Sequence, residues 1–292
     1  MKLNKKMNLS NFDYISYNRC TFCDSVDVTK IITIHQHPEV NYFFCNTCKV
    51  SYTDKQLSEA STKDIYANYF DDHQLKTGIE PKILGNHLFH FFSSKKTDFK
   101  NIKILDFGGG DGSISKYLGD KLKEHRCCEN YTVDVFDLYE CEQKIAGVNY
   151  LRSEAEIQNN TYDIVIASAV LEHLNSPMKK MHFLFNAMKS GGYFYARTPF
   201  RLPMILMFVK LKIKKMGMQF PWHLFDMGRV FWENIPHLFS AKHQIDLKII
   251  ASRPSVVQTP FKENGKKYLL SKIFKAPAYL FKKWNLVGGW EV

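Results

Sequence analysis

The sequence lacks a long hydrophobic run. Its longest apolar stretch, Leu202 to Val209, contains a proline and is far shorter than the roughly 20 residues that a membrane-spanning helix needs. No apolar segment typical of a secretory signal follows Met1, and we find neither an internal repeat nor a low-complexity tract. The composition, with 45% hydrophobic and 24% charged residues, is that of a globular chain. We therefore expect a cytoplasmic protein of one or two domains whose cysteines stay reduced.

Acidic residues are scarce in the last third of the chain. Residues 200–292 contain 16 basic and five acidic residues, whereas residues 1–199 contain 24 of each, so the whole net charge of +11 lies in the last third. Such an excess favours an anionic partner, unless it is simply a lysine-rich solvated surface. The lysines that carry this hypothesis are Lys210, Lys212, Lys214, Lys215, Lys262, Lys266, Lys267, Lys272 and Lys275.

Three anionic partners fit this basic third. The first is a small-molecule or glycan acceptor that carries phosphate, and the second is the inner face of a membrane, contacted peripherally. RNA is the third and the least favoured, because the cysteine-rich region, where RNA contacts would be expected, is not basic.

Four of the seven cysteines form two C-x2-C pairs separated by 21 residues. Two such pairs are typical of a tetrahedral zinc site, in which four thiolates leave no open coordination position, so the zinc is structural. His35 and His37 lie between the pairs and remain alternative ligands if the register differs. The predicted ligands are Cys20, Cys23, Cys45 and Cys48.

Short apolar strands alternate with helices between about residues 100 and 200. This alternation indicates an α/β fold with a parallel sheet covered on both faces. The predicted strands are 102–107, 131–136, 148–151, 162–168 and 192–197, with further candidates at 245–251 and 286–292, and the predicted helices are 113–124 and 178–188.

A glycine-rich segment follows the first of these strands. The strand ends in Asp106, and glycines at 108, 110 and 112 precede a helix, which is typical of a loop that lets a ligand lie against the backbone. The next strand ends before Asp137, an acid where such folds bind ribose hydroxyls, and Asp134 would lie within the sheet. A dinucleotide-dependent oxidoreductase is disfavoured, because Ser113 replaces the third glycine and Asp137 comes 29 residues after Gly108 rather than roughly 20.

Together these segments resemble the class I S-adenosylmethionine-dependent methyltransferases. The matching text is LDFGGGDG, the acid after the second strand, YDIVIASAVLEHL and KSGGYFYARTP, in the family's order across about residues 102–200. The resemblance implies a seven-stranded Rossmann-like sheet that binds S-adenosylmethionine. It places Asp106, Phe107, Gly108 and Gly110 at the methionine part, Asp137 and Leu138 at the ribose, Ser153 and Glu154 at the adenine, and Ala167 and Ser168 beside the methyl donor.

The cysteine region resembles the zinc-binding domain of sugar methyltransferases in deoxysugar and surface-polysaccharide pathways, across about residues 19–69. The ending WNLVGGWEV also resembles the C-terminus of those proteins. The sugar C-methyltransferases have a further C-terminal domain for which this sequence has no room, so we expect O- or N-methylation before C-methylation. RNA methylation is an alternative, because some ribosomal RNA methyltransferases also have a four-cysteine finger. A non-catalytic cofactor-binding scaffold is another.

Two histidines are the candidate catalytic groups. His173 follows the 162–168 strand, at the rim where acceptors bind, and His223 precedes the last helix in the segment expected to cover the acceptor. Some quinone-pathway O-methyltransferases bind metal with E-x-x-E-H at this place, but Ala169 replaces the first glutamate and disfavours a metal at Glu172 and His173. No (N/D)-P-P-(Y/F) motif follows the strand, which argues against methylation of a planar base nitrogen.

The expected organisation has four parts. Residues 15–52 form a zinc ribbon, 53–99 a helical linker, 100–255 a Rossmann-like methyltransferase domain with an acceptor-covering insertion at about 200–240, and 256–292 a basic C-terminal region.

Overall fold

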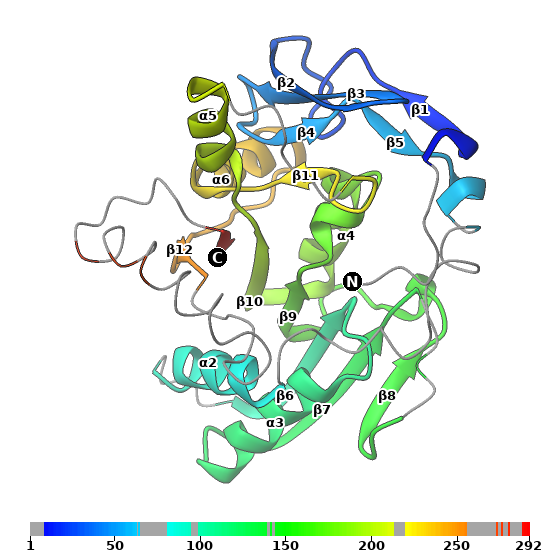
Figure 1. Cartoon of the computed structure of the whole chain (residues 1–292). Coiled ribbons are helices and arrows are strands. Elements are labelled where there is room, and N and C mark those ends of the chain that lie inside the picture. The colour runs from blue at the N-terminus through cyan, green and yellow to red at the C-terminus, as the bar shows by residue number, and fades with distance from the viewer. Residues whose placement is uncertain are drawn as a thin grey trace.

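The computed structural model describes residues 9–62, 64, 81–94, 99–138, 141, 144–212, 220–255, 273, 276, 280 and 288–292. A seven-stranded mixed sheet forms its centre (Figure 1). Five strands are parallel, and β13 runs antiparallel to both β10 and β12 at one side. The strand order is β12 (Arg253–Pro254), β13 (Gly289–Glu291), β10 (Met188–Pro199), β9 (Tyr162–Ser168), β6 (Phe99–Phe107), β7 (Cys128–Phe136) and β8 (Val148–Leu151).

Helices cover both faces of this sheet because successive apolar residues of a strand point to opposite sides. Ile104 packs in a core with α2 (Pro81–Ser93) and α3 (Ser113–Glu124), whereas Leu105 packs in another with α4 (Pro177–Ala187) and α6 (Arg229–His243). The near-continuous apolar runs of the central strands are therefore buried on both sides, as predicted.

The cysteine region forms a four-stranded antiparallel sheet, in the order β11 (Phe225–Asp226), β4 (Ser51–Thr53), β3 (Glu39–Cys45) and β2 (Val28–Gln36). Its edge strand β11 comes from much later in the sequence and pairs with β4, so that Phe225 lies opposite Tyr52. A separate two-stranded ribbon joins β1 (Tyr14–Ser16) to β5 (Lys55–Leu57). The cysteine region is thus completed by the segment that follows β10.

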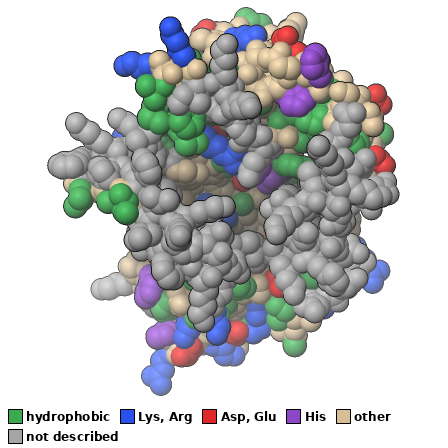
Figure 2. All heavy atoms as spheres, in the orientation of Figure 1, with side chains coloured by type: hydrophobic (Ala, Val, Ile, Leu, Met, Phe, Trp, Pro, Cys, Tyr) green, Lys and Arg blue, Asp and Glu red, His purple; other side chains and the backbone are tan. Residues whose placement is uncertain are grey.

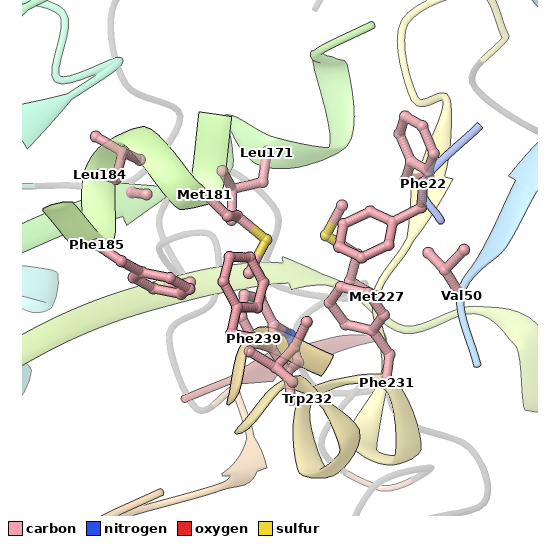
Figure 3. Close-up of a cluster of buried hydrophobic side chains, with 14 of the residues drawn as sticks. Phe22, Val50, Leu171, Met181, Leu184, Phe185, Met227, Phe231, Trp232 and Phe239 are labelled. Carbon is pink, nitrogen blue, oxygen red and sulfur yellow. The ribbon is translucent and has the colours of Figure 1, made fainter. Parts of the chain in front are cut away.

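One continuous apolar core joins the cysteine region to the central sheet (Figure 3). Phe22, within the first cysteine pair, contacts Phe231 of α6 edge to face, with ring centroids 4.9 Å apart. Lys242 and Asn234 of α6 donate hydrogen bonds to the backbone carbonyls of Cys23 and Thr47, at 3.3 Å each. The range 15–52, predicted as a zinc ribbon, therefore shares its core with the central sheet.

Two expected elements differ from the structure. Residues 245–250 form no strand, and the short β12 begins at Arg253 instead. The range 53–99, expected as helical, starts with the end of β4 and with β5, although α2 is a helix. The strand candidate at 286–292 contains β13, which belongs to the central sheet, and the lysines at 214, 215 and 262–275 lie outside the described residues. Such short edge strands depend on pairing with distant segments, which local pattern does not encode.

Candidate cofactor and acceptor site

The glycine loop after β6 adopts a backbone that requires glycine. Gly108 and Gly110 have φ angles of 71° and 56°, in the left-handed region that side chains disfavour. A Cβ on Gly108 would lie 2.6 Å from Cγ2 of Val170, so this loop packs directly against the loop after β9. The N–H of Gly108 also donates to the carbonyl of Phe136 at 2.7 Å, which ties the loop to the end of β7.

Asp106 is a buried acid beneath this loop. Its side chain is 3% exposed, and Oδ2 has no hydrogen-bond partner among the described residues. Burial raises the pKa of the Asp106 carboxyl to about 7. A buried, incompletely bonded carboxylate would be stabilised by a cation such as the ammonium group of a methionine moiety, so the residue fits the place predicted for it.

The two acids of the second strand occupy different environments. Asp134 lies within the sheet, accepts hydrogen bonds from Tyr162 and Asn149 at 2.9 Å each, and lies 3.2 Å from the ammonium of Lys103. Asp137 lies beyond the end of β7, where Oδ2 accepts the N–H of Gly110 at 2.9 Å. Of the two, Asp137 is therefore the one at the carboxyl edge beside the glycine loop, as the sequence predicts.

The remaining predicted cofactor residues differ in accessibility. Phe107 and Ala167 are buried in the core, at 3% and 0% exposed. Leu138 is 71% exposed next to Asp137. Glu154 forms an ion pair with Lys180, and the N–H of Ser153 donates to Glu156 at 3.2 Å, which orders the turn predicted to meet adenine.

A second group of polar side chains lies at the carboxyl ends of β9 and β10. Ser168, the last residue of β9, accepts a hydrogen bond of 3.1 Å from Nε of Arg197 on β10. Within the described part of the chain, the Arg197 side chain bonds to this neutral hydroxyl and to no carboxylate. A half-buried guanidinium with only a neutral partner is suited to an anionic ligand.

The two candidate histidines contact each other. His173, in a short 3-10 turn (η4, Leu171–His173), and His223 pack edge to face with ring centroids 4.8 Å apart. The Nδ1 atom of His173 lies 2.7 Å from the carbonyl oxygen of Trp222. Because a carbonyl only accepts, Nδ1 carries the proton, and the neutral ring has its lone pair on Nε2.

His223 has the opposite tautomer. A guanidinium nitrogen of Arg201 donates to Nδ1 of His223 at 2.6 Å, so the proton of the neutral ring is on Nε2. Burial lowers the pKa of His223 to about 2, and the positive charge of Arg201 adds to this effect. His223 is therefore a neutral hydrogen-bond donor, whereas His173 presents an acceptor nitrogen.

Glu172 completes this cluster. It is 2% exposed, Oε1 lies 3.9 Å from Nε2 of His173, and Oε2 has no partner among the described residues. One potential ligand atom from each of Glu172, His173 and His223 lies within 4.8 Å of the others, an arrangement that the sequence had disfavoured. The guanidinium of Arg201 in contact with His223 nevertheless opposes a metal cation at this position.

The four paired cysteines converge on one buried point. The sulfurs of Cys20 and Cys48 lie 3.6 Å apart, as do those of Cys23 and Cys45, and none forms a disulfide. Tetrahedral zinc with bonds of about 2.3 Å separates its sulfurs by about 3.8 Å, so these residues fit the ion. His35 and His37 are not part of this group.

Sequence reasoning missed two contacts of the histidine pair. Trp222 contributes only a carbonyl, which no motif reveals. Arg201 belongs to the basic third, but its contact with His223 depends on how the chain returns after α5 (Leu202–Lys210). A cavity of about 460 Å³ between α2, α6 and the first half of β10 contains none of the predicted site residues.

Comparison with known proteins agrees with this geometry. A family described as "Methyltransferase domain" matches residues 73–251, which include the glycine loop, Asp137 and both histidines. The chain belongs to this methyltransferase domain family. The cysteine pairs lie before the matched range.

Its sequence is also 24% identical, over 155 residues, to the ubiquinone/menaquinone biosynthesis C-methyltransferase UbiE of Wigglesworthia glossinidia brevipalpis. That match covers 49% of this chain and 60% of the relative, less than two thirds of the relative's length. Among solved structures, the plantazolicin methyltransferase BpumL in complex with SAH is 13% identical, with a TM-score of 0.48 and coverage of 80% of this chain and 90% of that one. A SAM-dependent methyltransferase from Aquifex aeolicus is 20% identical, with a TM-score of 0.35 and coverage of 45% and 74%. No helix of the described residues has the length and apolar character needed to cross a membrane.

Proposed function

We propose that this protein transfers a methyl group from S-adenosylmethionine to a hydroxyl or amine of a sugar, nucleotide-sugar or glycan intermediate. The observation that carries the proposal is the position of His173. Its loop packs on Gly108 through Val170, and its Nε2 atom is available as a hydrogen-bond acceptor. A proton acceptor therefore lies close to the predicted cofactor loop.

The cofactor supplies an electrophilic methyl group on a sulfonium when it is bound. Asp106 would hold the methionine ammonium, Gly108 and Gly110 would let the backbone approach the ligand, and Asp137 would accept the ribose hydroxyls. Ser153 and Glu154 would meet the adenine, and the carboxyl end of β9 at Ser168 would flank the methyl donor. The N–H of Gly110 already donates to Asp137, so the carboxylate would accept hydrogen bonds from the ribose in addition to this one.

His173 would receive the proton that an acceptor hydroxyl loses as its oxygen attacks the methyl carbon. The carbonyl of Trp222 keeps Nδ1 protonated and thereby directs the basic lone pair to Nε2. A resulting imidazolium would lie near the buried carboxylate of Glu172, which stabilises positive charge. His223, held neutral beside it, would donate a hydrogen bond to the acceptor.

Arg197 supports a polar, anionic acceptor. Within the described part of the chain, its guanidinium, near the end of β10, bonds to the neutral hydroxyl of Ser168. The relative named as a C-methyltransferase of ubiquinone and menaquinone biosynthesis supports a second candidate, methylation of a quinone precursor carbon. The polar cluster favours the sugar or glycan acceptor over such an apolar ring.

The deciding experiment is a transfer screen with methyl-labelled S-adenosylmethionine and the full chain. Nucleotide-sugars, glycan lipids, quinone precursors and ribosomal RNA are offered separately. Transfer to a sugar-bearing acceptor that His173→Ala abolishes is the expected result, and transfer to the quinone precursor or to RNA alone would refute the sugar assignment.

Calorimetry on the same preparation tests the cofactor site separately. We expect Asp137→Ala to weaken S-adenosylmethionine binding at least about tenfold, because the ribose loses charge-assisted hydrogen bonds. Asp120→Asn removes an exposed acid of α3 whose partners are Lys116 and Tyr131, and it should leave binding unchanged. Equal affinities of Asp137→Ala and wild type would refute the ribose assignment.

A further inference from the structure

Helix α5 exposes apolar side chains that would normally be buried. None of its residues before Lys210 is charged, and a helix that is apolar on all sides is normally buried. Here only Ile205 is buried. Met204, Leu206, Met207 and Val209 are 37–45% exposed, and Leu211, just past the helix, is 60% exposed.

This apolar surface is contiguous. Successive residues of an α-helix are about 100° apart, so Met207 lies opposite the buried Ile205, with Leu206 and Leu211 on either side of it. Figure 2 shows hydrophobic side chains gathered over the position of α5, with Lys and Arg side chains beside them. The other exposed large hydrophobic residues of the described chain are dispersed over several elements. Isolated exposed apolar residues are ordinary, but a contiguous patch indicates a partner.

The helix is held firmly at its base. The carboxylate of Asp226 in β11 accepts the backbone N–H groups of Arg201 and Leu202, at 2.7–2.9 Å, and so caps the start of α5. Asp226 is 4% exposed, and Ile205 of the helix is fully buried. The start of α5 is therefore fixed to the rest of the protein, and the side of the helix opposite Ile205 is exposed.

The charge around the patch identifies the kind of partner. No acidic residue occurs between Arg201 and Phe225, and the exposed Lys210 and Lys212 lie at the end of the helix, beside the apolar side chains. Apolar side chains next to lysines match a bilayer interface, where acyl chains lie just below anionic headgroups. A second copy of this chain would bring the same lysines together, which is unfavourable.

We propose that α5 docks the protein on an anionic lipid membrane, with Leu206, Met207 and Leu211 in the interfacial layer and Lys210 and Lys212 at the headgroups. This inference depends on α5 alone and not on the proposed acceptor. It would place the Arg201 end of α5, and with it the acceptor cluster, close to a membrane surface.

Vesicle flotation of the full chain at low salt tests the proposal. We expect the protein to float with vesicles of equal parts phosphatidylglycerol and phosphatidylcholine, and not with phosphatidylcholine alone. The double variants Leu206→Ser with Met207→Ser and Lys210→Glu with Lys212→Glu should each lower the partition coefficient at least about tenfold. Because all four side chains are exposed, the melting temperatures should stay near that of the wild type.

The matched control is Lys82→Glu with Ile83→Ser on α2, at the opposite end of the molecule in Figure 1. Both side chains are exposed there too, so their substitution changes charge and apolarity away from the patch and should leave flotation unchanged. Failure of the wild type to float, or an equal loss in the α2 variant, would overturn the proposal. Concentration-dependent dimers that Leu206→Ser with Met207→Ser abolishes would also overturn it, in favour of a second copy as the occupant.

Discussion

His173 and Trp222 are joined across 49 positions of sequence by a contact of 2.7 Å between Nδ1 and a carbonyl oxygen. Beside it, the N–H of Leu224 donates to the carbonyl of Glu172 at 2.9 Å. These two contacts tie the loop after β9 to the segment that leads into β11. The orientation of the candidate base is therefore set by backbone geometry, which a change of neighbouring side chains leaves intact.

Replacing His173 with alanine should lower kcat for the identified acceptor by roughly a hundredfold or more, because the acceptor proton loses its base. S-adenosylmethionine affinity should not change, since no cofactor contact is removed. The matched variant His223→Ala should lower kcat less than about tenfold, because this ring is neutral and only donates a hydrogen bond. Equal losses of kcat in both variants would contradict these different roles.

Cofactor affinity should depend on pH through Asp106. Burial raises the pKa of this carboxyl to about 7 in the free protein, and the ligand's ammonium requires the ionised form. Affinity should therefore fall as the pH drops below about 7, approaching tenfold per pH unit, and should level off above it. Calorimetry from about pH 5.5 to 8 measures this dependence. The variant Asp106→Asn should bind the cofactor more weakly than the wild type at high pH, and its affinity should no longer depend on pH. A pH-independent affinity of the wild type would exclude Asp106 as the ammonium partner.

About one zinc ion per chain should copurify with the protein, as metal analysis would show. Removal of the metal by a chelator should lower the melting temperature of the whole chain, because the cysteines belong to the same core as α4 and α6. Cys48→Ser should do the same, whereas Cys127→Ser, outside the cluster, should not. A metal-free protein with the full melting temperature would rule out the structural zinc site.

Phe22 links the cysteine region to α6, and Phe22→Ala should lower the free energy of unfolding by about 3–5 kcal/mol. The loss combines the transfer free energy of a fully buried ring with the cavity left against Phe231. Denaturant unfolding should remain a single transition, because both regions share one core. Substitution of the exposed Val26 by alanine in the same region should change stability by less than about 0.5 kcal/mol. Two separate transitions in the wild type would show that the regions unfold independently.

Local pattern predicted the elements whose residues are apolar on both faces of the central sheet. The strands 148–151 and 162–168 and the helix 113–124 have the predicted bounds, since near-continuous apolar runs and helical periodicity are local properties. The edge of the sheet opposite β8 was less predictable, although the candidate at 286–292 contains β13. The stretch 245–251 has strand-like residues and forms none, because a strand exists only where a partner offers hydrogen bonds.

Three features of this protein can be recognised in short stretches of its sequence: two C-x2-C pairs, a glycine loop between a strand and a helix, and acids at strand ends. Each of these signals lies within a few residues, where backbone conformation and ligand spacing are set locally. Tertiary structure alone decided which side chains meet, since contacts such as Arg201 with His223, Phe22 with Phe231 and β11 with β4 join segments that the sequence keeps apart. It also left α5 exposed, because burial depends on what the rest of the chain places around a helix and not on the helix's own residues.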